Sequence, residues 1–339
     1  MALTIVGSMI GVGFATGREV VSFFVRYGWW SILMIGMSAI CFFAFIKTSL
    51  SLFVKTNHIN KKCKMAKNGI KNGLKIGNLY SILDVIVFIC QLAISSTMIA
   101  GFSSLVCGQA SKVAQIVVSV VLCGVVFSLV SFRKNSVYWL NVILSILMFS
   151  LVIIVFIGAT ANGIKLSRQL FDVGVMFFVN PISYVGMNLI IVYSLLKEFS
   201  SSLVNKVEVN LVSFFISLFM FLSLTVVSVL LLLFGGDVFM QDMPIVSIAY
   251  NISLFFGLFY SLVVSASIFT TLISTVYSSS KFLSAKMRSW VAVFVVLMVS
   301  FVVSLFGFGG LIDYFYPIIG VVCIVFLILN SLKSAKMCY

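Results

Sequence analysis

Apolar residues form long runs along the chain, and short polar breaks separate the runs. A helix crosses the hydrocarbon core of a bilayer with about 20 apolar residues, and most of these runs reach that length. Their continuity excludes a membrane β-barrel, because its strands alternate apolar and polar residues. The pattern predicts about ten membrane-spanning helices, near residues 3–25, 29–53, 79–106, 112–132, 137–160, 171–195, 207–234, 246–278, 288–307 and 311–332.

The one long polar connection, residues 54–78, is rich in Lys and Asn. Basic residues collect in cytoplasmic loops. A cytoplasmic N-terminus places 17 of the 22 Lys and Arg residues inside and leaves five outside: Arg18, Arg26, Lys112, Lys165 and Arg168. We therefore expect both termini in the cytoplasm, and the basic loop 54–78 against anionic lipid headgroups.

The composition supports an integral membrane protein. Hydrophobic residues make up 62% of the chain and charged residues only 9%, against about a quarter charged in soluble domains. The basic loops explain the net charge of +14 without a nucleic-acid partner. One histidine and seven scattered cysteines give no metal-site pattern. No triad, Walker loop or HExxH motif is present, so we expect no enzyme activity and no cofactor beyond a coupling Na⁺ or H⁺.

Ten spans divide into two sets of five, at about 3–160 and 171–332. Because five is odd, the second set enters the membrane from the opposite side, as in the inverted repeats of transporters. Spans one and six then correspond, and both contain helix-breaking residues: GSMIGVGFATGREVVSFF in the first and FFVNPISYVGMN in the sixth. Paired interrupted segments of this kind indicate a binding site near the middle of the membrane.

The glycines of span one permit a helix break at residues 11–13. A second half-helix would begin near Phe14, and its partly positive N-terminus suits a carboxylate. Carbonyls at the end of the first half-helix suit a cation. In span six, Pro181 removes a backbone donor and predicts a second break. Close helix packing is the alternative reading of the glycines.

Polar residues share one face in spans three and eight. The face of span three contains Asp84, Phe88, Gln91 and Ser95, and that of span eight contains Ser267, Thr270, Thr271, Ser274 and Ser278. These spans correspond in the inverted-repeat scheme, so the two faces could flank a central cavity. The alternative is ordinary hydrogen bonding of the hydroxyls to helix backbones.

Three ionisable residues fall inside or beside the apolar runs. Arg18 and Glu19 follow the glycine stretch, and Asp313 begins span ten. Intramembrane charges indicate a functional site by default. We expect Arg18 to pair with Asp313 or Glu19 in an outer gate. A static ion pair, or side chains that reach to the interface, is the alternative.

The stretch SMIGVGFATGREVVSFF resembles the first span of the YkvI-like bacterial membrane proteins, and LDVIVF and STMIAG of span three also look similar. These proteins belong to the amino acid–polyamine–organocation superfamily, with the LeuT-type fold of five plus five inverted helices, of which helices one and six are broken. The resemblance implies a multi-pass protein of the bacterial cytoplasmic membrane. It also implies alternating access at a site between spans one, three, six and eight, with sodium or proton coupling in many members.

The resemblance and the residue pattern together give three expected groups. The substrate-binding residues are Ile10, Gly11, Val12, Gly13, Phe14, Gln91, Ser95, Asn180, Pro181, Ser183, Tyr184 and Ser267. The cation-binding residues are Met9, Val12, Ser267, Thr270 and Thr271, and the outer gate is Arg18, Glu19 and Asp313. Compared with family members, the first half-helix is short, about ten residues or about 15 Å, so we expect further residues upstream.

These observations predict a secondary active transporter of a small organic solute, an amino acid or related amine. Spans one, two, six and seven would rock against the rest. Since no carboxylate is placed clearly at mid-membrane, sodium is favoured over protons. The alternative is a non-transporting receptor or sensor subunit of the same fold, like a germinant receptor. A channel is disfavoured, because no acidic ring or filter repeat appears. Membrane lipid is the expected partner besides the solute, and the oligomeric state stays open.

Overall fold

The protein is an all-α integral membrane protein, and the computed structural model contains no strand among the residues that it describes. Those residues are 5–6, 9, 12–65, 74–108, 111–132, 137–161, 175–200, 203, 205–234, 239, 241–284, 287–322 and 325. Five helices in this part are long and apolar enough to cross a membrane alone, and a bent helix pair makes a sixth candidate. Shorter apolar helices cover residues 146–161 and 176–190.

Each of the ten predicted spans contains helix. The elements are α2 (Val12–Thr16), α3 (Arg18–Phe23), η1 (Val25–Trp30), α4 (Ser31–Met65), α5 (Leu74–Cys107), α6 (Lys112–Phe132), α7 (Val137–Ala161), α8 (Met176–Phe199), α9 (Lys206–Phe234), α10 (Pro244–Ile252), α11 (Leu254–Leu283), α12 (Ser289–Ser304), α13 (Phe308–Gly310) and η4 (Leu311–Phe315). Helix continues from η4 through residues 316–322.

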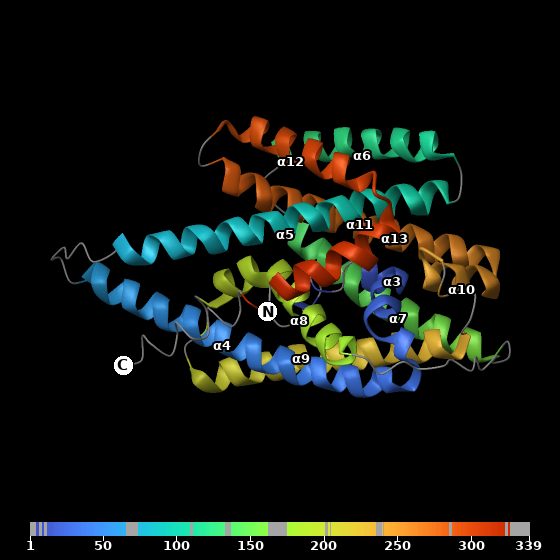
Figure 1. Cartoon of the computed structure of the whole chain (residues 1–339), viewed down its shortest axis with the longest axis horizontal. Coiled ribbons are helices and arrows are strands. Elements are labelled where there is room, and N and C mark those ends of the chain that lie inside the picture. The colour runs from blue at the N-terminus through green and yellow to red at the C-terminus, as the bar shows by residue number, and fades with distance from the viewer. Residues whose placement is uncertain are drawn as a thin grey trace.

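The long helices run side by side in layers (Figure 1). Helices α4 and α9 pack together on one side of the bundle, and α6 packs with α12 on the other. Between them lie α5 with α11, and α3 with α8. This arrangement surrounds α3 and α8 with other helices, and it buries the polar residues Arg18, Glu19, Ser183 and Asn188.

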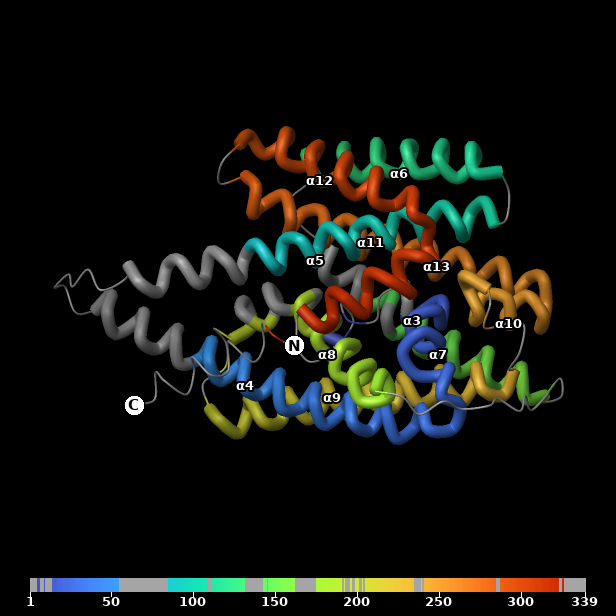
Figure 2. Tube along the Cα trace, in the orientation of Figure 1, coloured from blue at the N-terminus to red at the C-terminus, as the bar shows by residue number. Residues whose placement is uncertain are grey.

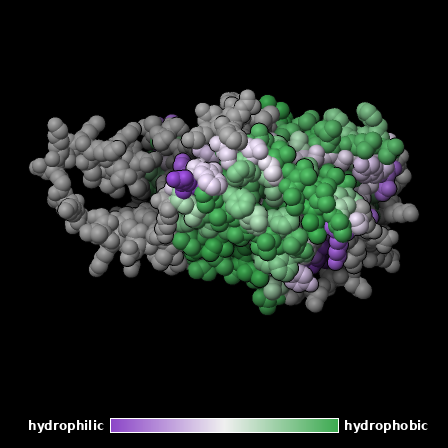
Figure 3. Space-filling model, turned by 90° about the horizontal axis from the view of Figure 1, so that it is seen from above, coloured by the Kyte–Doolittle hydropathy of each residue, from purple (hydrophilic) through white to green (hydrophobic). Residues whose placement is uncertain are grey.

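The outer helices present apolar side chains to the surroundings. Figure 3 shows a broad apolar surface over the described part of the molecule, with hydrophilic residues toward its two ends. On α6 and α12 the exposed side chains are Val113, Ile116, Val117, Val120, Val121, Val125, Trp290, Phe294, Met298 and Val302. Such a surface is stable only against lipid, because exposed apolar patches of this extent are rare on soluble proteins.

The basic segment 54–78 differs from the predicted loop. Helix α4 continues to Met65, and α5 already begins at Leu74. The low hydropathy of residues 54–78 indicates only that this segment leaves the hydrocarbon core. Low hydropathy does not by itself end a helix, because lysine is a good helix former and the hydrogen bonds of a helix are internal to the segment. Residues 66–73 lie outside the described part.

The predicted eighth span, 246–278, contains two helices rather than one. Ser253 separates α10 from α11 with an extended backbone, φ −163° and ψ 152°. Its Oγ accepts a hydrogen bond from the amide of Phe256 at 3.1 Å and so caps α11. The membrane-spanning helix is therefore α11, and α10 is a short helix that precedes it.

The predicted break in span six is wrong. Helix α8 runs without interruption from Met176 to Phe199, with Pro181 inside it. Pro181 is its sixth residue, so its missing amide would have bonded to the carbonyl of Phe177 in the first turn. A proline at this position removes one intrahelical hydrogen bond and commonly bends a helix, but here the helix continues through it.

Span one is interrupted at Gly17, and of the predicted break at residues 11–13 the structure describes only Val12 and Gly13, both in α2. Gly13 lies inside α2, and Gly17 separates α2 from α3 with a left-handed backbone, φ 81°. Only glycine adopts this conformation without strain. A Cβ at Gly17 would also lie 2.8 Å from Cγ1 of Ile245 in α10. Ile10 and Gly11 lie outside the described residues.

The chain reverses sharply after α12. The axes of residues 289–304 and 308–322 form an angle of 97°, and Gly307 at the turn has φ 84°. This turn directs α13, η4 and residues 316–322 back toward α3 and α8 in the middle of the bundle (Figure 2). It thereby brings Asp313 close to span one.

Candidate functional site

Helix α3 presents its polar side chains to two different neighbours. Arg18 and Ser22 are one turn apart and both contact Asp313 in η4. Phe23 is one turn beyond Glu19 and packs against Tyr184 of α8, with ring centroids 5.5 Å apart. Since residues four apart share a helix face, α3 contributes to an ionic cluster through one face and to a buried polar region through the other.

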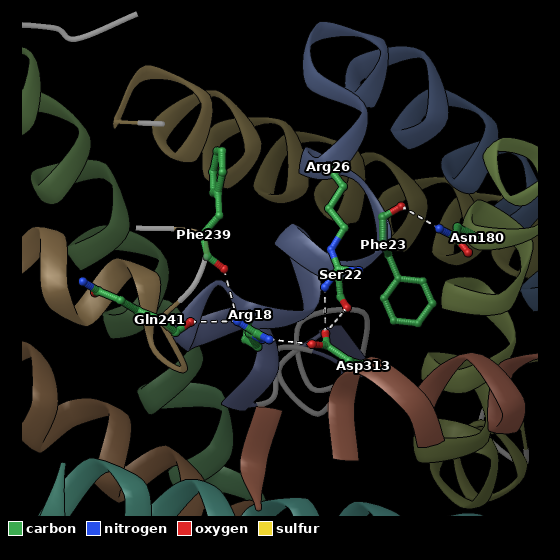
Figure 4. Close-up of polar contacts among 8 residues, drawn as sticks. All are labelled: Arg18, Ser22, Phe23, Arg26, Asn180, Phe239, Gln241 and Asp313. Carbon is green, nitrogen blue, oxygen red and sulfur yellow. Dashed lines mark hydrogen bonds and ion pairs between the residues drawn. The ribbon is translucent and has the colours of Figure 1, made fainter. Parts of the chain in front are cut away.

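The ionic cluster is centred on Arg18 (Figure 4). Its Nη2 lies 2.5 Å from Oδ2 of Asp313. Its Nη1 donates to the carbonyl oxygens of Phe239 at 3.1 Å and Gln241 at 3.0 Å, in the connection between α9 and α10. Arg18 therefore links three segments that are distant in the sequence.

Asp313 receives further donors through its second oxygen. Ser22 Oγ donates to Oδ1 at 2.5 Å, and Nη2 of Arg26 lies 3.3 Å from the same oxygen. The Arg26 side chain is 55% exposed, against 19% for Asp313 and 10% for Arg18. Asp313 lies in a π-helical turn, a geometry often found at functional sites. The expected Arg18–Asp313 pair is thus present.

Glu19 forms no such pair. Arg18 and Glu19 are the two charged side chains that are buried in the described part of the chain, at 8% and 5% exposure. Within that part, Glu19 has neither a hydrogen bond nor an ion pair. The predicted Arg18–Glu19 contact is absent, because adjacent helix residues do not face each other. Glu19 instead lies one turn before Phe23, on the face of α3 that packs against Tyr184 of α8.

Unpartnered polar atoms gather on the part of α8 that faces α3. Within the described part of the chain, the buried atoms Ser183 Oγ, Tyr184 Oη and Asn188 Oδ1 have no hydrogen-bond partner. Asn188 Nδ2 donates to the carbonyl of Tyr184 at 3.0 Å, which fixes the amide. Buried polar atoms are nearly always satisfied in folded proteins, so this group of three is a candidate binding surface.

The chain after η4 closes this region. Tyr316 Oη and Thr97 Oγ1 of α5 lie 2.6 Å apart and share a hydrogen bond. One turn later, Gly320 approaches α8 so closely that a Cβ would lie 2.5 Å from the carbonyl oxygen of Ser183. The candidate site is therefore bounded by α3, α8, α5 and residues 316–322.

Aromatic rings surround Tyr184. The ring centroids of Phe24 and Phe42 lie 5.1 and 6.3 Å from that of Tyr184, in edge-to-face arrangements. Together with Phe23 these rings exclude water from one side of the site. Low local polarity strengthens any charge interaction that Glu19 makes.

Two predicted substrate residues connect helices instead. Gln91 Nε2 donates to Ser278 Oγ at 3.0 Å, and its Oε1 accepts from Ser279 Oγ at 3.3 Å. Ser95 Oγ lies 2.6 Å from Ser300 Oγ of α12. The amide of Gln91 thus joins α5 to α11, and Ser95 joins α5 to α12.

Span six residues Asn180 and Pro181 also have protein partners. Asn180 Nδ2 donates to Tyr27 Oη at 3.3 Å and to the carbonyl of Phe23 at 3.5 Å (Figure 4). Ser38 Oγ of α4 donates to the carbonyl of Pro181 at 3.2 Å. The structure thus uses this stretch to hold α8 against the end of α3 and against α4.

The expected cation-binding residues remain a prediction. Thr270 Oγ1 donates to the carbonyl of Ser267 at 3.1 Å, a bond within α11. Ser267, Thr271 and Met9 are buried, as is Phe14. Val12 lies in α2, next to residues 10 and 11, which are outside the described part of the chain.

Sequence reasoning missed four residues at the site: Thr97, Asn188, Tyr260 and Tyr316. Asn188 is one turn from Tyr184 on the same face, and Tyr316 is one turn from Asp313, so helical spacing from the predicted residues would have found both. Tyr260 of α11 donates to the carbonyl of Ala15 at 2.7 Å, next to the interruption at Gly17. Nothing in the sequence pairs these two positions.

Tyr260→Phe is expected to lower the unfolding free energy by about 1–3 kcal/mol, because the carbonyl of Ala15 would be buried without a donor. The measurement is the thermal unfolding midpoint of the purified protein. Tyr250→Phe is the matched control, since Tyr250 is partly exposed on α10. Equal unfolding midpoints for the two variants would show that the hydrogen bond from Tyr260 to Ala15 does not contribute to stability.

Comparisons with known proteins identify proteins to which this chain is similar. No protein-family model matches the chain. The chain is 25% identical over 337 residues to the uncharacterized membrane protein YkvI of Bacillus subtilis (strain 168). The aligned region covers 96% of this chain and 93% of that protein. Among solved structures it is similar to Mhp1, a nucleobase-cation-symport-1 family transporter, in a closed conformation with bromovinylhydantoin bound. There the TM-score is 0.49 and the identity 13%, over 94% of this chain and 74% of the other.

Proposed function

We propose that the protein is a secondary active transporter that carries a small organic solute, an amino acid or a related amine, across the membrane by alternating access. The observation that supports this most is the buried region between α3 and α8. Among the residues that the structure describes, it contains a carboxylate without a partner, Glu19, and three polar atoms of Ser183, Tyr184 and Asn188 that also lack one. Unsatisfied polar groups inside a membrane protein are costly and mark solute pathways.

The interruption at Gly17 supports a moving element. It separates α2 from α3, and α3 is held by side-chain contacts to η4 and to the α9–α10 connection. A short helix bounded by a flexible glycine can change its position with few changes elsewhere. In this proposal the Arg18–Asp313 cluster forms the outer gate, and its opening gives the solute access to Glu19 and α8.

The site differs in kind from the one expected. Two unwound segments would have offered backbone carbonyls and amides. Because α8 is continuous, α8 contributes side chains instead. The five-plus-five inverted repeat, the rocking of spans one, two, six and seven, and the coupling to Na⁺ or H⁺ are retained as parts of the proposal.

Uptake into proteoliposomes tests the proposal. The purified protein is reconstituted and offered the standard amino acids and their decarboxylated amines, each under a sodium gradient, a proton gradient and no gradient. We expect gradient-dependent accumulation of one chemical group of solutes relative to protein-free vesicles. Lack of accumulation of every compound under all three conditions would refute transport of this class.

A further inference from the structure

We infer that Glu19 binds the positively charged group of the solute, and that the solute is an organic ammonium ion without a carboxylate. This inference rests on the proposed function, and it narrows the solute from amino acids and amines to amines. The two buried charged residues on α3 differ in their partners, because Arg18 has an ion pair and Glu19 has none in the described part of the chain.

The positive charge of Arg18 is neutralised by the groups around it. Its guanidinium contacts the carboxylate of Asp313 and two backbone carbonyls. Glu19 is the next residue and equally buried, yet no cation or donor meets it in the described part of the chain. An uncompensated buried carboxylate costs several kcal/mol, so this site favours a ligand that brings a positive charge.

The surroundings of Glu19 suit an ammonium group. The buried polar atoms that lack a partner on the facing part of α8, within the described residues, are oxygens: the hydroxyls of Ser183 and Tyr184 and the amide oxygen of Asn188. An alkylammonium carries up to three N–H donors, as the lysine side chain does, and such donors need acceptor oxygens. The rings of Phe23, Phe24 and Tyr184 add faces that attract cations.

A solute carboxylate finds no comparable partner. Arg18 is the one buried cation among the described residues, and Asp313 already neutralises it. Its Nε retains a free N–H, but a second carboxylate there would lie beside Asp313 and be repelled by it. The charge pattern therefore favours a cationic amine over the zwitterionic amino acid with the same side chain.

Binding of matched pairs to the purified protein tests this inference. Tyramine and tyrosine, and isoamylamine and leucine, differ only by the carboxylate. They are titrated by calorimetry at pH 6, where the amines are almost fully protonated. We expect at least tenfold tighter binding of each amine. Glu19→Gln, which keeps the size and removes the charge, should weaken amine binding at least tenfold. Glu19→Asp should retain part of it.

Glu208→Gln is the matched control, because Glu208 lies in the first turn of α9, away from this region, and amine affinity should not change. Tighter binding of the amino acids, or amine binding to Glu19→Gln within twofold of the wild-type affinity, would overturn the inference. So would a thermal stabilisation by NaCl alone that Glu19→Gln abolishes, because Glu19 would then serve sodium. Amine binding that depends on Glu19 without any uptake would leave the inference standing and refute the transport proposal.

Discussion

Arg18→Ala is expected to destabilise the protein by about 2–3 kcal/mol, because it leaves the largely buried Asp313 with an exposed arginine as its remaining cation. It also removes the donor to the carbonyls of Phe239 and Gln241. In the proposed function this cluster forms the outer gate, which would then close less tightly, so that solute would leak through the protein. The measurements are the thermal unfolding midpoint and the solute efflux rate from proteoliposomes.

Arg26→Ala is the matched control for this change. Arg26 contacts the same carboxylate, but its side chain is 55% exposed, so its loss should cost less than about 1 kcal/mol. The double variant Arg18→Ala with Asp313→Asn should be less destabilised than the sum of the two single variants, since it removes both charges together. Equal effects of Arg18→Ala and Arg26→Ala would show that burial does not distinguish the two arginines.

Gly320→Ala is expected to reduce transport at least tenfold. The added Cβ would lie 2.5 Å from the carbonyl oxygen and 2.6 Å from the Cβ of Ser183, and neither atom belongs to the flexible end of a side chain. The helix of residues 316–322 must therefore move away from α8, at a cost of about 1–3 kcal/mol. That shift displaces Tyr316 and Ser183 together and widens the candidate site.

Gly124→Ala on α6 controls for the general effect of the substitution. Nothing lies within 4 Å of a Cβ there, and alanine is the better helix former by up to about 1 kcal/mol. The unfolding midpoint of Gly124→Ala should stay the same or rise, and its uptake should be unchanged. Wild-type uptake by Gly320→Ala would show that the contact between α8 and the last helix does not shape the site.

The positions of the helices followed well from the sequence, and their interruptions did not. Hydrophobic runs report where the chain leaves water, which locates the spans. They do not report where a helix starts. The hydropathy pattern predicts that span six begins at residue 171, which puts Pro181 near the middle of the span. In the structure Val175 is a turn, α8 starts at Met176, and the helix continues through Pro181.

The ionic cluster could be predicted in part from the sequence. Arg18 and Asp313 are rare charges in apolar runs, and opposite charges in a membrane seek each other. The separate environment of Glu19 was missed, because its proximity to Arg18 in sequence suggested a shared role. On a helix, adjacent residues point about 100° apart, and which neighbour each one meets depends on the packing of α8 and η4. Hydropathy carries no information on that packing.

Counterflow measures the central claim, alternating access, most directly. Proteoliposomes are loaded with unlabelled tyramine at pH 6 and placed in a trace of labelled tyramine. A carrier exchanges one molecule for another, so we predict a transient accumulation of label above its external concentration. Protein-free vesicles should not show it, and Glu19→Gln should show much less. Binding of tyramine to the protein with no such accumulation would contradict alternating access and indicate a receptor instead.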